Sequence, residues 1–238
     1  MKYRTATECP FCGNTTGPWR VAVQPMARQS EMALFGRDET IYMVCQCGGY
    51  FQNPIPTDAS IDKLYSDKYY DEFQARKNAL AFEMPRALRV AKYLPQEPGD
   101  MIDVGCATGE LMFLAKEAGW QVAGVEPSKR GRAISQQYGT VYYDCDEVDR
   151  TFDLVISVHV LEHVPRPVDF LKQLAKLLKP GGLMVVVVPK DNYRAPHLIA
   201  VNEETVKILF DRAGIGNVEI GSFVPYADLT DIIVKVRI

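Results

Sequence analysis

The sequence predicts an α/β fold in which a largely parallel sheet carries helices on both faces, preceded by a small cysteine-rich module. Apolar runs alternate with helix-like segments from residue 101 to the C-terminus, a pattern typical of such a sheet. A glycine-rich turn follows the first of these runs, in the segment Met101–Leu111. Four of the six cysteines fall within the first 47 residues and predict the separate module. We therefore expect a module at 1–56 and a larger domain at 57–238.

The composition is that of an ordinary globular chain. Of its 238 residues, 47% are hydrophobic and 24% are charged, and the net charge is -3 with a sequence pI near 5.7. This charge offers no broad basic surface, so we expect no nucleic-acid partner. The N-terminus lacks the apolar segment of a signal peptide, and apolar runs such as Leu183–Val188 are too short to cross a bilayer. We therefore expect a cytoplasmic protein with free thiols and no membrane partner.

Two cysteine pairs predict a metal site in the N-terminal module. Cys9 and Cys12 lie in C-P-F-C-G, where glycine lets backbone amides approach the sulfurs in one half of a tetrahedral zinc site. Cys45 and Cys47 lie in C-Q-C-G, one residue shorter than the usual pair because Val44 takes the expected first position. Four thiolates close the site and leave no open position for chemistry, so we predict a structural Zn2+. The alternative is four buried cysteines that pack as small hydrophobic residues.

The module and its connection to the larger domain contain short elements. Two strands, at 19–23 and 40–44, are expected between the cysteine pairs. The proline-containing segment 52–58 is expected to connect the two parts. Helices are then expected over 59–67 and 69–94, and Pro85 should kink or interrupt the second of them.

The glycine-rich turn predicts a ligand site. An apolar strand, a tight loop and a helix N-terminus follow one another in Met101–Leu111, an arrangement that binds nucleotide-like cofactors. Gly105 and Gly109 are separated by three residues, so the dinucleotide fingerprint G-x-G-x-x-G is absent. The carboxylate of Asp103 would repel a pyrophosphate. It suits a ligand that has a cationic amino-acid end.

The rest of the chain alternates strands with helices. A helix is expected at 111–118 and a buried strand at 121–126, ending in Glu126. Asp103 and Glu126 are separated by 23 positions, and the acid that binds a ribose in such folds lies about 20 residues beyond the loop. The remaining elements are expected as strands at 140–143, 152–158 and 183–188, helices after Pro165 through Leu178 and from Asn202 to Gly214, and a terminal strand pair at 218–224 and 231–238.

Four motifs in order carry a resemblance to a known family. The loop Asp103–Gly109 reads D-x-G-x-x-x-G, Glu126 ends the next strand, and the segments F-D-L-V-I-S-V-H-V-L-E-H-V-P and L-L-K-P-G-G-L follow. The chain resembles class I S-adenosylmethionine (SAM) methyltransferases with an N-terminal zinc ribbon, of the kind that act on sugars, glycans or natural products in bacteria. The resemblance implies a seven-stranded Rossmann-like sheet that ends in an antiparallel strand.

The resemblance also implies a SAM site. Glu126 would accept hydrogen bonds from the ribose hydroxyls, and Asp144 with Cys145 would lie near the adenine. Tyr70 would be part of a lid formed by the helix before the first strand, with packing against the module as the alternative. The full expected set is Tyr70, Asp103, Gly105, Cys106, Ala107, Gly109, Leu111, Glu126, Pro127, Asp144, Cys145, Val158 and His159.

Histidines at the ends of two strands are the candidate catalytic groups. Methyl transfer is a displacement at a sulfonium carbon, so the protein mainly aligns donor and acceptor, but a hydroxyl acceptor must also lose a proton. His163 is the first candidate for the base, because the residue that ends this L-E-H segment faces the methyl group in related enzymes. His159 is the second candidate, and His197 is expected to line the acceptor site. The alternative is that His163 only packs at the helix start and that catalysis uses proximity alone.

Cys106 and Cys145 have no base nearby in the sequence and are not expected to act as nucleophiles.

The predicted function is O-methylation of a small-molecule or sugar/glycan acceptor. Sugar C-methyltransferases share the zinc ribbon but have a third domain beyond the point at which this sequence stops. One alternative is an rRNA or tRNA methyltransferase, which the acidic composition disfavours. Another is a zinc-ribbon interaction protein on an inactive methyltransferase scaffold, which the intact motif acids and glycines disfavour. The sequence does not predict the acceptor or the oligomeric state.

Overall fold

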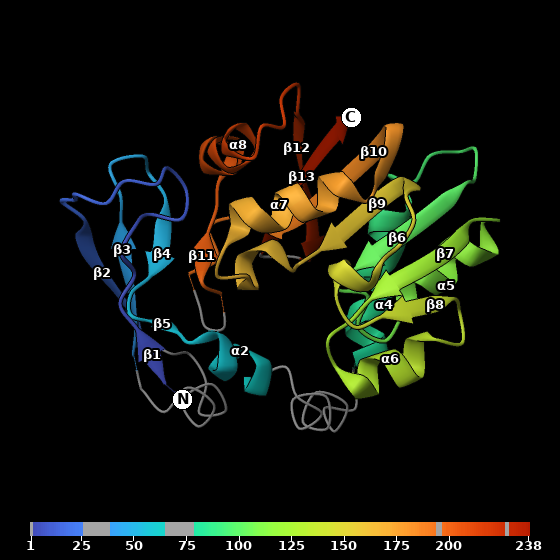
Figure 1. Ribbon diagram of the computed structural model, residues 1–238, viewed down its shortest axis with the longest axis horizontal. Helices are drawn as coiled ribbons and strands as arrows, with labels where there is room; N and C mark the ends of the chain where they lie inside the picture. The colour runs from blue at the N-terminus through green and yellow to red at the C-terminus, as the bar shows by residue number, and fades with distance from the viewer. Residues whose placement is uncertain (1, 26–38, 65–78, 194–196, 227–228) are drawn as a thin grey trace.

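A computed structural model describes residues 2–25, 39–64, 79–193, 197–226 and 229–238. Figure 1 shows the N-terminal module at one end of the molecule and the larger domain, with its broad sheet, at the other. Within the described residues, the helices are too short or too polar to cross a membrane.

The larger domain is built on a seven-stranded sheet, as predicted. Its strand order is β12-β13-β10-β9-β6-β7-β8. The strands from β10 to β8 pair in parallel, whereas β13 runs antiparallel to both of its neighbours, β10 and β12. The bounds are β6 (Asp100–Val104), β7 (Gln121–Val125), β8 (Thr140–Tyr142), β9 (Phe152–Val158), β10 (Leu178–Pro189), β12 (Glu219–Tyr226) and β13 (Leu229–Arg237).

Helices cover both faces of this sheet because successive strand residues point to opposite sides. In β6, Ile102 belongs to one buried cluster together with Leu174 of α7, and Met101 belongs to a second cluster together with Met112 of α5. In Figure 1, α7 lies across the front of the sheet, with α8 beside the module. The helices are α4 (Ala79–Ala91), α5 (Glu110–Glu117), α6 (Lys129–Ser135), α7 (Pro167–Lys176) and α8 (Glu203–Arg212).

Three elements differ in detail from the sequence prediction. Helix α4 continues through Pro85. Helix α6 was not predicted, because Gly131 interrupts its pattern, although Ser128 caps it by accepting a hydrogen bond from the Gly131 amide. Strand β10 begins at Leu178, before the Lys-Pro-Gly-Gly segment that was expected to close the preceding helix, and its pairing with β9 shifts register between Leu178 and Leu183.

The N-terminal module is joined to the larger domain through a shared sheet. Strands β2 (Arg20–Pro25), β3 (Glu39–Val44) and β4 (Tyr50–Gln52) pair antiparallel, which agrees with the two expected strands. The fourth strand, β11 (Ile199–Ala200), comes from the larger domain and pairs with β4 (Figure 1). Short strands β1 (Tyr3–Arg4) and β5 (Ile55–Pro56) pair beneath this sheet, and α2 (Asp58–Leu64) follows.

Candidate active site and metal centre

The loop after β6 needs glycine at its first turn. Gly105 has φ +86°, in the left-handed region, and a Cβ at this position would lie 2.2 Å from Cγ2 of Val160. The Gly105 amide donates to the Val125 carbonyl at 2.8 Å, which ties the loop to β7. Gly109, at φ +88°, directly precedes α5. The loop therefore lies against the segment that follows β9 and ends at a helix N-terminus.

Two buried acids face this loop. Asp103 is 4% exposed, and burial, helped by the charges of Glu110 and Glu126, raises its pKa to about 7. Glu126 is also buried, and its carboxylate accepts hydrogen bonds from the Ala107 amide at 3.0 Å and the Ser128 amide at 2.9 Å. Two neighbouring buried carboxylates favour a cationic ligand, because a positive charge beside them lowers the free energy needed to ionise both carboxyl groups.

The other expected cofactor residues that the structure describes lie around the ends of β6, β7, β8 and β9. Cys106 and Leu111 are buried, and the Cys106 thiol lies 3.7 Å from the Ser135 hydroxyl. Asp144 caps a short 3₁₀ turn by accepting hydrogen bonds from two backbone amides. Burial raises the pKa of Cys145 to about 11, and that of Cys106 also rises, so both thiols stay protonated near neutrality. Pro127 follows Glu126, Val158 ends β9, and Tyr70 lies outside the described residues.

His159 is held by an acid that the sequence analysis missed. It follows β9 with φ +56°, and its Nε2 lies 2.8 Å from Oδ2 of Asp231, which is fully buried. Burial lowers the pKa of His159, and the hydrogen bond to Asp231 opposes this shift. Asp231 pairs with Pro189 at the end of β10, because β13 runs antiparallel and starts at the edge where the parallel strands end. An acid directly before the apolar run I-I-V was the available signal.

A second group of side chains brings His163 and His197 together with Glu162. The two imidazole rings are edge to face, with centroids 4.8 Å apart. Glu162 is 1% exposed, and Oε1 lies 3.6 Å from Nε2 of His163 and 3.9 Å from Nδ1 of His159. Burial raises the pKa of Glu162 to about 8. One ligand atom from each of Glu162, His163 and His197 lies within 4.8 Å of the other two. This group of three side chains can therefore accept a proton or hold a cation.

The four cysteines of the module converge on one point. Cys9 and Cys47 have their sulfurs 3.8 Å apart, and those of Cys12 and Cys45 are 3.6 Å apart. A tetrahedral zinc with Zn–S bonds of about 2.3 Å requires sulfurs about 3.8 Å apart. The donor set therefore fits a four-thiolate metal ion, and the shortened second pair does not prevent it.

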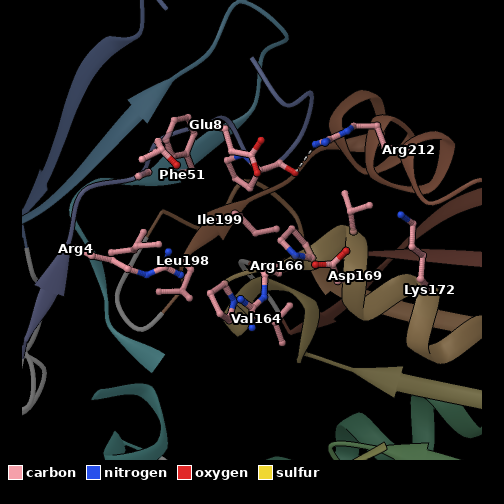
Figure 2. A pocket seen from close by; sticks show the side chains of 17 residues that line it. Arg4, Glu8, Phe51, Val164, Arg166, Asp169, Lys172, Leu198, Ile199 and Arg212 are labelled. Carbon is pink, nitrogen blue, oxygen red and sulfur yellow. Dashed lines mark hydrogen bonds between the residues drawn. The ribbon is translucent and has the colours of Figure 1, made fainter. Parts of the chain in front are cut away.

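A cavity of about 270 Å³ lies between the module and the larger domain. Figure 2 shows its charged side chains from both parts, including Arg4 and Lys172, and Arg212 reaching toward the module, where Nη1 donates to the Phe11 carbonyl. Val164 and Leu198 line the cavity and directly follow His163 and His197 in the sequence. The cavity therefore adjoins the backbone that carries both histidines.

Comparison with known proteins identifies the family. The model of the methyltransferase domain family matches residues 70–218. The chain belongs to this family. Over 148 residues it is 32% identical to a ubiquinone biosynthesis O-methyltransferase of Bradyrhizobium sp. (strain ORS 278), covering 58% of this chain and 57% of that protein. A protein of the same description from Rhodopseudomonas palustris (strain BisB18) is 35% identical over 116 residues, covering 44% and 46%. The chain thus spans about half the length of the curated relatives it matches.

Solved methyltransferases share the fold. The 1,6-didemethyltoxoflavin-N1-methyltransferase of Burkholderia thailandensis, solved with S-adenosylhomocysteine (SAH), superposes with a TM-score of 0.64 at 16% identity, over 79% of this chain and 95% of that one. The magnesium protoporphyrin IX methyltransferase of Synechocystis PCC 6803, also solved with SAH, gives a TM-score of 0.59 at 16% identity, over 76% and 99%. The methyltransferase fold predicted from the motifs is confirmed.

Proposed function

We propose that this protein is a SAM-dependent methyltransferase that methylates a hydroxyl of a small-molecule or glycan acceptor. The observation that carries the proposal is the pair of buried acids, Asp103 and Glu126, around the loop that Gly105 and Gly109 shape. The two curated relatives described above are both named ubiquinone biosynthesis O-methyltransferases, which supports the acceptor chemistry.

SAM supplies an activated methyl group on a sulfonium. In the proposed complex, Glu126 accepts hydrogen bonds from the ribose hydroxyls, and Asp103 lies near the cationic amino-acid end. Asp144 and Cys145 lie on the adenine side, whereas the expected role of Tyr70 in a lid falls outside the described residues. The loop residues Gly105 to Gly109, with Leu111, Pro127 and Val158, shape the walls of the site.

The acceptor side carries the proton chemistry. As the acceptor oxygen bonds to the methyl carbon, the sulfur–carbon bond breaks and the acceptor proton passes to a base. We assign this base to His163, because it borders both Glu162 and His197. His159 is the second candidate, and its bond to Asp231 would stabilise the imidazolium form.

Titration with SAH tests the cofactor assignment. Isothermal titration calorimetry should detect one SAH per chain, and NAD should not compete, because the loop lacks the dinucleotide fingerprint. Absence of SAH binding to folded protein would overturn the proposal.

Acid should weaken SAH binding. A carboxyl with a pKa of about 7 loses its charge as the pH falls, and only the ionised form attracts the α-ammonium of the ligand. From pH 7.5 to 5.5 the affinity should fall about 25-fold, the ratio of the ionised fractions of Asp103 at the two pH values. Calorimetry across this range measures the effect, and Asp103→Asn should flatten the profile. A wild-type profile equally flat would show that Asp103 does not face the ammonium.

We further propose that Cys9, Cys12, Cys45 and Cys47 hold a structural zinc in an N-terminal module at 1–56, ahead of a catalytic domain at 57–238. Protein purified without added metal should contain about one zinc per chain by elemental analysis. Cys45→Ser should lose most of this zinc and lower the melting temperature, whereas Cys145→Ser should retain it. Wild-type protein without zinc would contradict the assignment.

A further inference from the structure

The segment that carries His197 is held by the N-terminal module. Strand β11 pairs with β4 through Ile199 opposite Phe51 and Ala200 opposite Tyr50. The Gln52 amide donates to the Leu198 carbonyl at 2.8 Å. The residues after His197 are thus an outer strand of the module's own sheet, although they are about 150 residues away in the sequence.

Two buried side chains of the module converge on the His197 carbonyl. The Tyr42 hydroxyl and the Gln52 side-chain amide both donate to this oxygen at 2.7 Å. Both residues are fully buried. A carbonyl oxygen has two lone pairs, so these donors use its whole acceptor capacity. Such a pair fixes the position of the peptide at His197.

Two of the four clustered cysteines and both of these donors belong to one hairpin. Tyr42 of β3 lies directly opposite Gln52 of β4, and the turn between the two strands carries Cys45 and Cys47. The register of this hairpin determines whether both donors reach the same oxygen.

The same backbone contacts the proposed acceptor site. The Leu198 amide donates to the Glu162 carbonyl at 2.7 Å. The His197 ring has Nδ1 3.0 Å from the Asn192 carbonyl and packs edge to face on His163. A displaced His197 peptide would therefore move this ring relative to its neighbour, His163.

We propose that Tyr42 and Gln52 are positioning residues for the imidazoles of His197 and His163, so that the cysteine module forms one wall of the acceptor site. The inference rests on the proposed function in one respect, the assignment of His163 and His197 to the acceptor site. The structural coupling can be tested without an acceptor.

The chain has three histidines, so histidine ring NMR gives a direct test. The three signals are assigned with single His→Gln variants and followed in Tyr42→Phe, Gln52→Leu and the double variant. The signals of His197 and His163 should shift, most in the double variant, whereas that of His159 should shift much less, because Asp231 holds the His159 ring through Nε2. SAH affinity, measured on the same samples, should be unchanged.

Thr40→Val is the matched control. Thr40 lies on β3 two residues before Tyr42, and its buried hydroxyl has no hydrogen-bond partner among the described residues, so its loss should move none of the three signals. Unchanged His163 and His197 signals in a folded double variant would overturn the proposal, as would equal shifts of all three. If the double variant does not fold, the single variants provide the test. Shifts of the His163 and His197 signals that are no larger than those in Thr40→Val would then overturn the proposal. If the wild-type protein does not bind SAH, that result would contradict the proposed function but not the structural coupling of Tyr42 and Gln52 to the two histidines.

Discussion

Replacing His163 with alanine should lower the rate of methyl transfer to a hydroxyl acceptor by about 10²- to 10⁴-fold, the usual contribution of a general base. The imidazole borders Glu162 and His197 at the end of the parallel strands, where an acceptor would meet the methyl group. Single-turnover transfer from labelled SAM measures the chemical step, and SAH affinity should remain close to that of the wild type.

Lys176→Ala is the control for this variant, because Lys176 is exposed on α7 and should not affect the rate. A His163→Ala rate within a few-fold of wild type would mean that the enzyme works by alignment alone. A large loss in His159→Asn instead would transfer the role of base to the His159–Asp231 pair.

Glu126→Ala should weaken SAH binding by about 100-fold, since hydrogen bonds to a charged group are worth about 1.5–3 kcal/mol each. The carboxylate also receives the amides of Ala107 and Ser128, so its removal releases the loop around the ligand. Calorimetry measures the affinity, and the melting temperature separates a local effect from general unfolding.

Glu117→Ala provides the control, because Glu117 is an exposed acid on α5. It should bind SAH like the wild type. If the SAH affinity of Glu126→Ala is within about three-fold of the wild-type affinity, the carboxylate stabilises the loop and does not bind the ribose.

Local and periodic features of the fold could be predicted from the sequence. The buried parallel strands appear as continuous apolar runs, as in β10, because both faces are covered. Asn202 caps α8 as expected, and its partner in the capping box is Thr205. Each cysteine pair is compact in sequence, but the contacts between the two pairs span 38 positions for Cys9 with Cys47 and 33 positions for Cys12 with Cys45. Their convergence was predicted because two such pairs are typical of one four-thiolate metal site.

Long-range contacts could not be predicted in this way. Asp231 meets His159 across 72 positions, and only the antiparallel register of β13 brings them together. The pairing of β11 with β4 depends on how the two parts dock, because a two-residue strand has no periodicity of its own. The acceptor side of the site is therefore where the structure adds most to the sequence analysis.

Transfer of a labelled methyl group from SAM tests the central claim most directly. The purified protein is incubated with a cell extract and labelled SAM at a concentration that saturates only the wild type, and the extract is then separated into small molecules, glycans, protein and RNA. Glu126→Ala is the weakly binding control. We expect label in the small-molecule or glycan fraction with the wild type only. Label confined to RNA and lost on ribonuclease treatment, or no difference between wild type and Glu126→Ala in any fraction, would contradict the account.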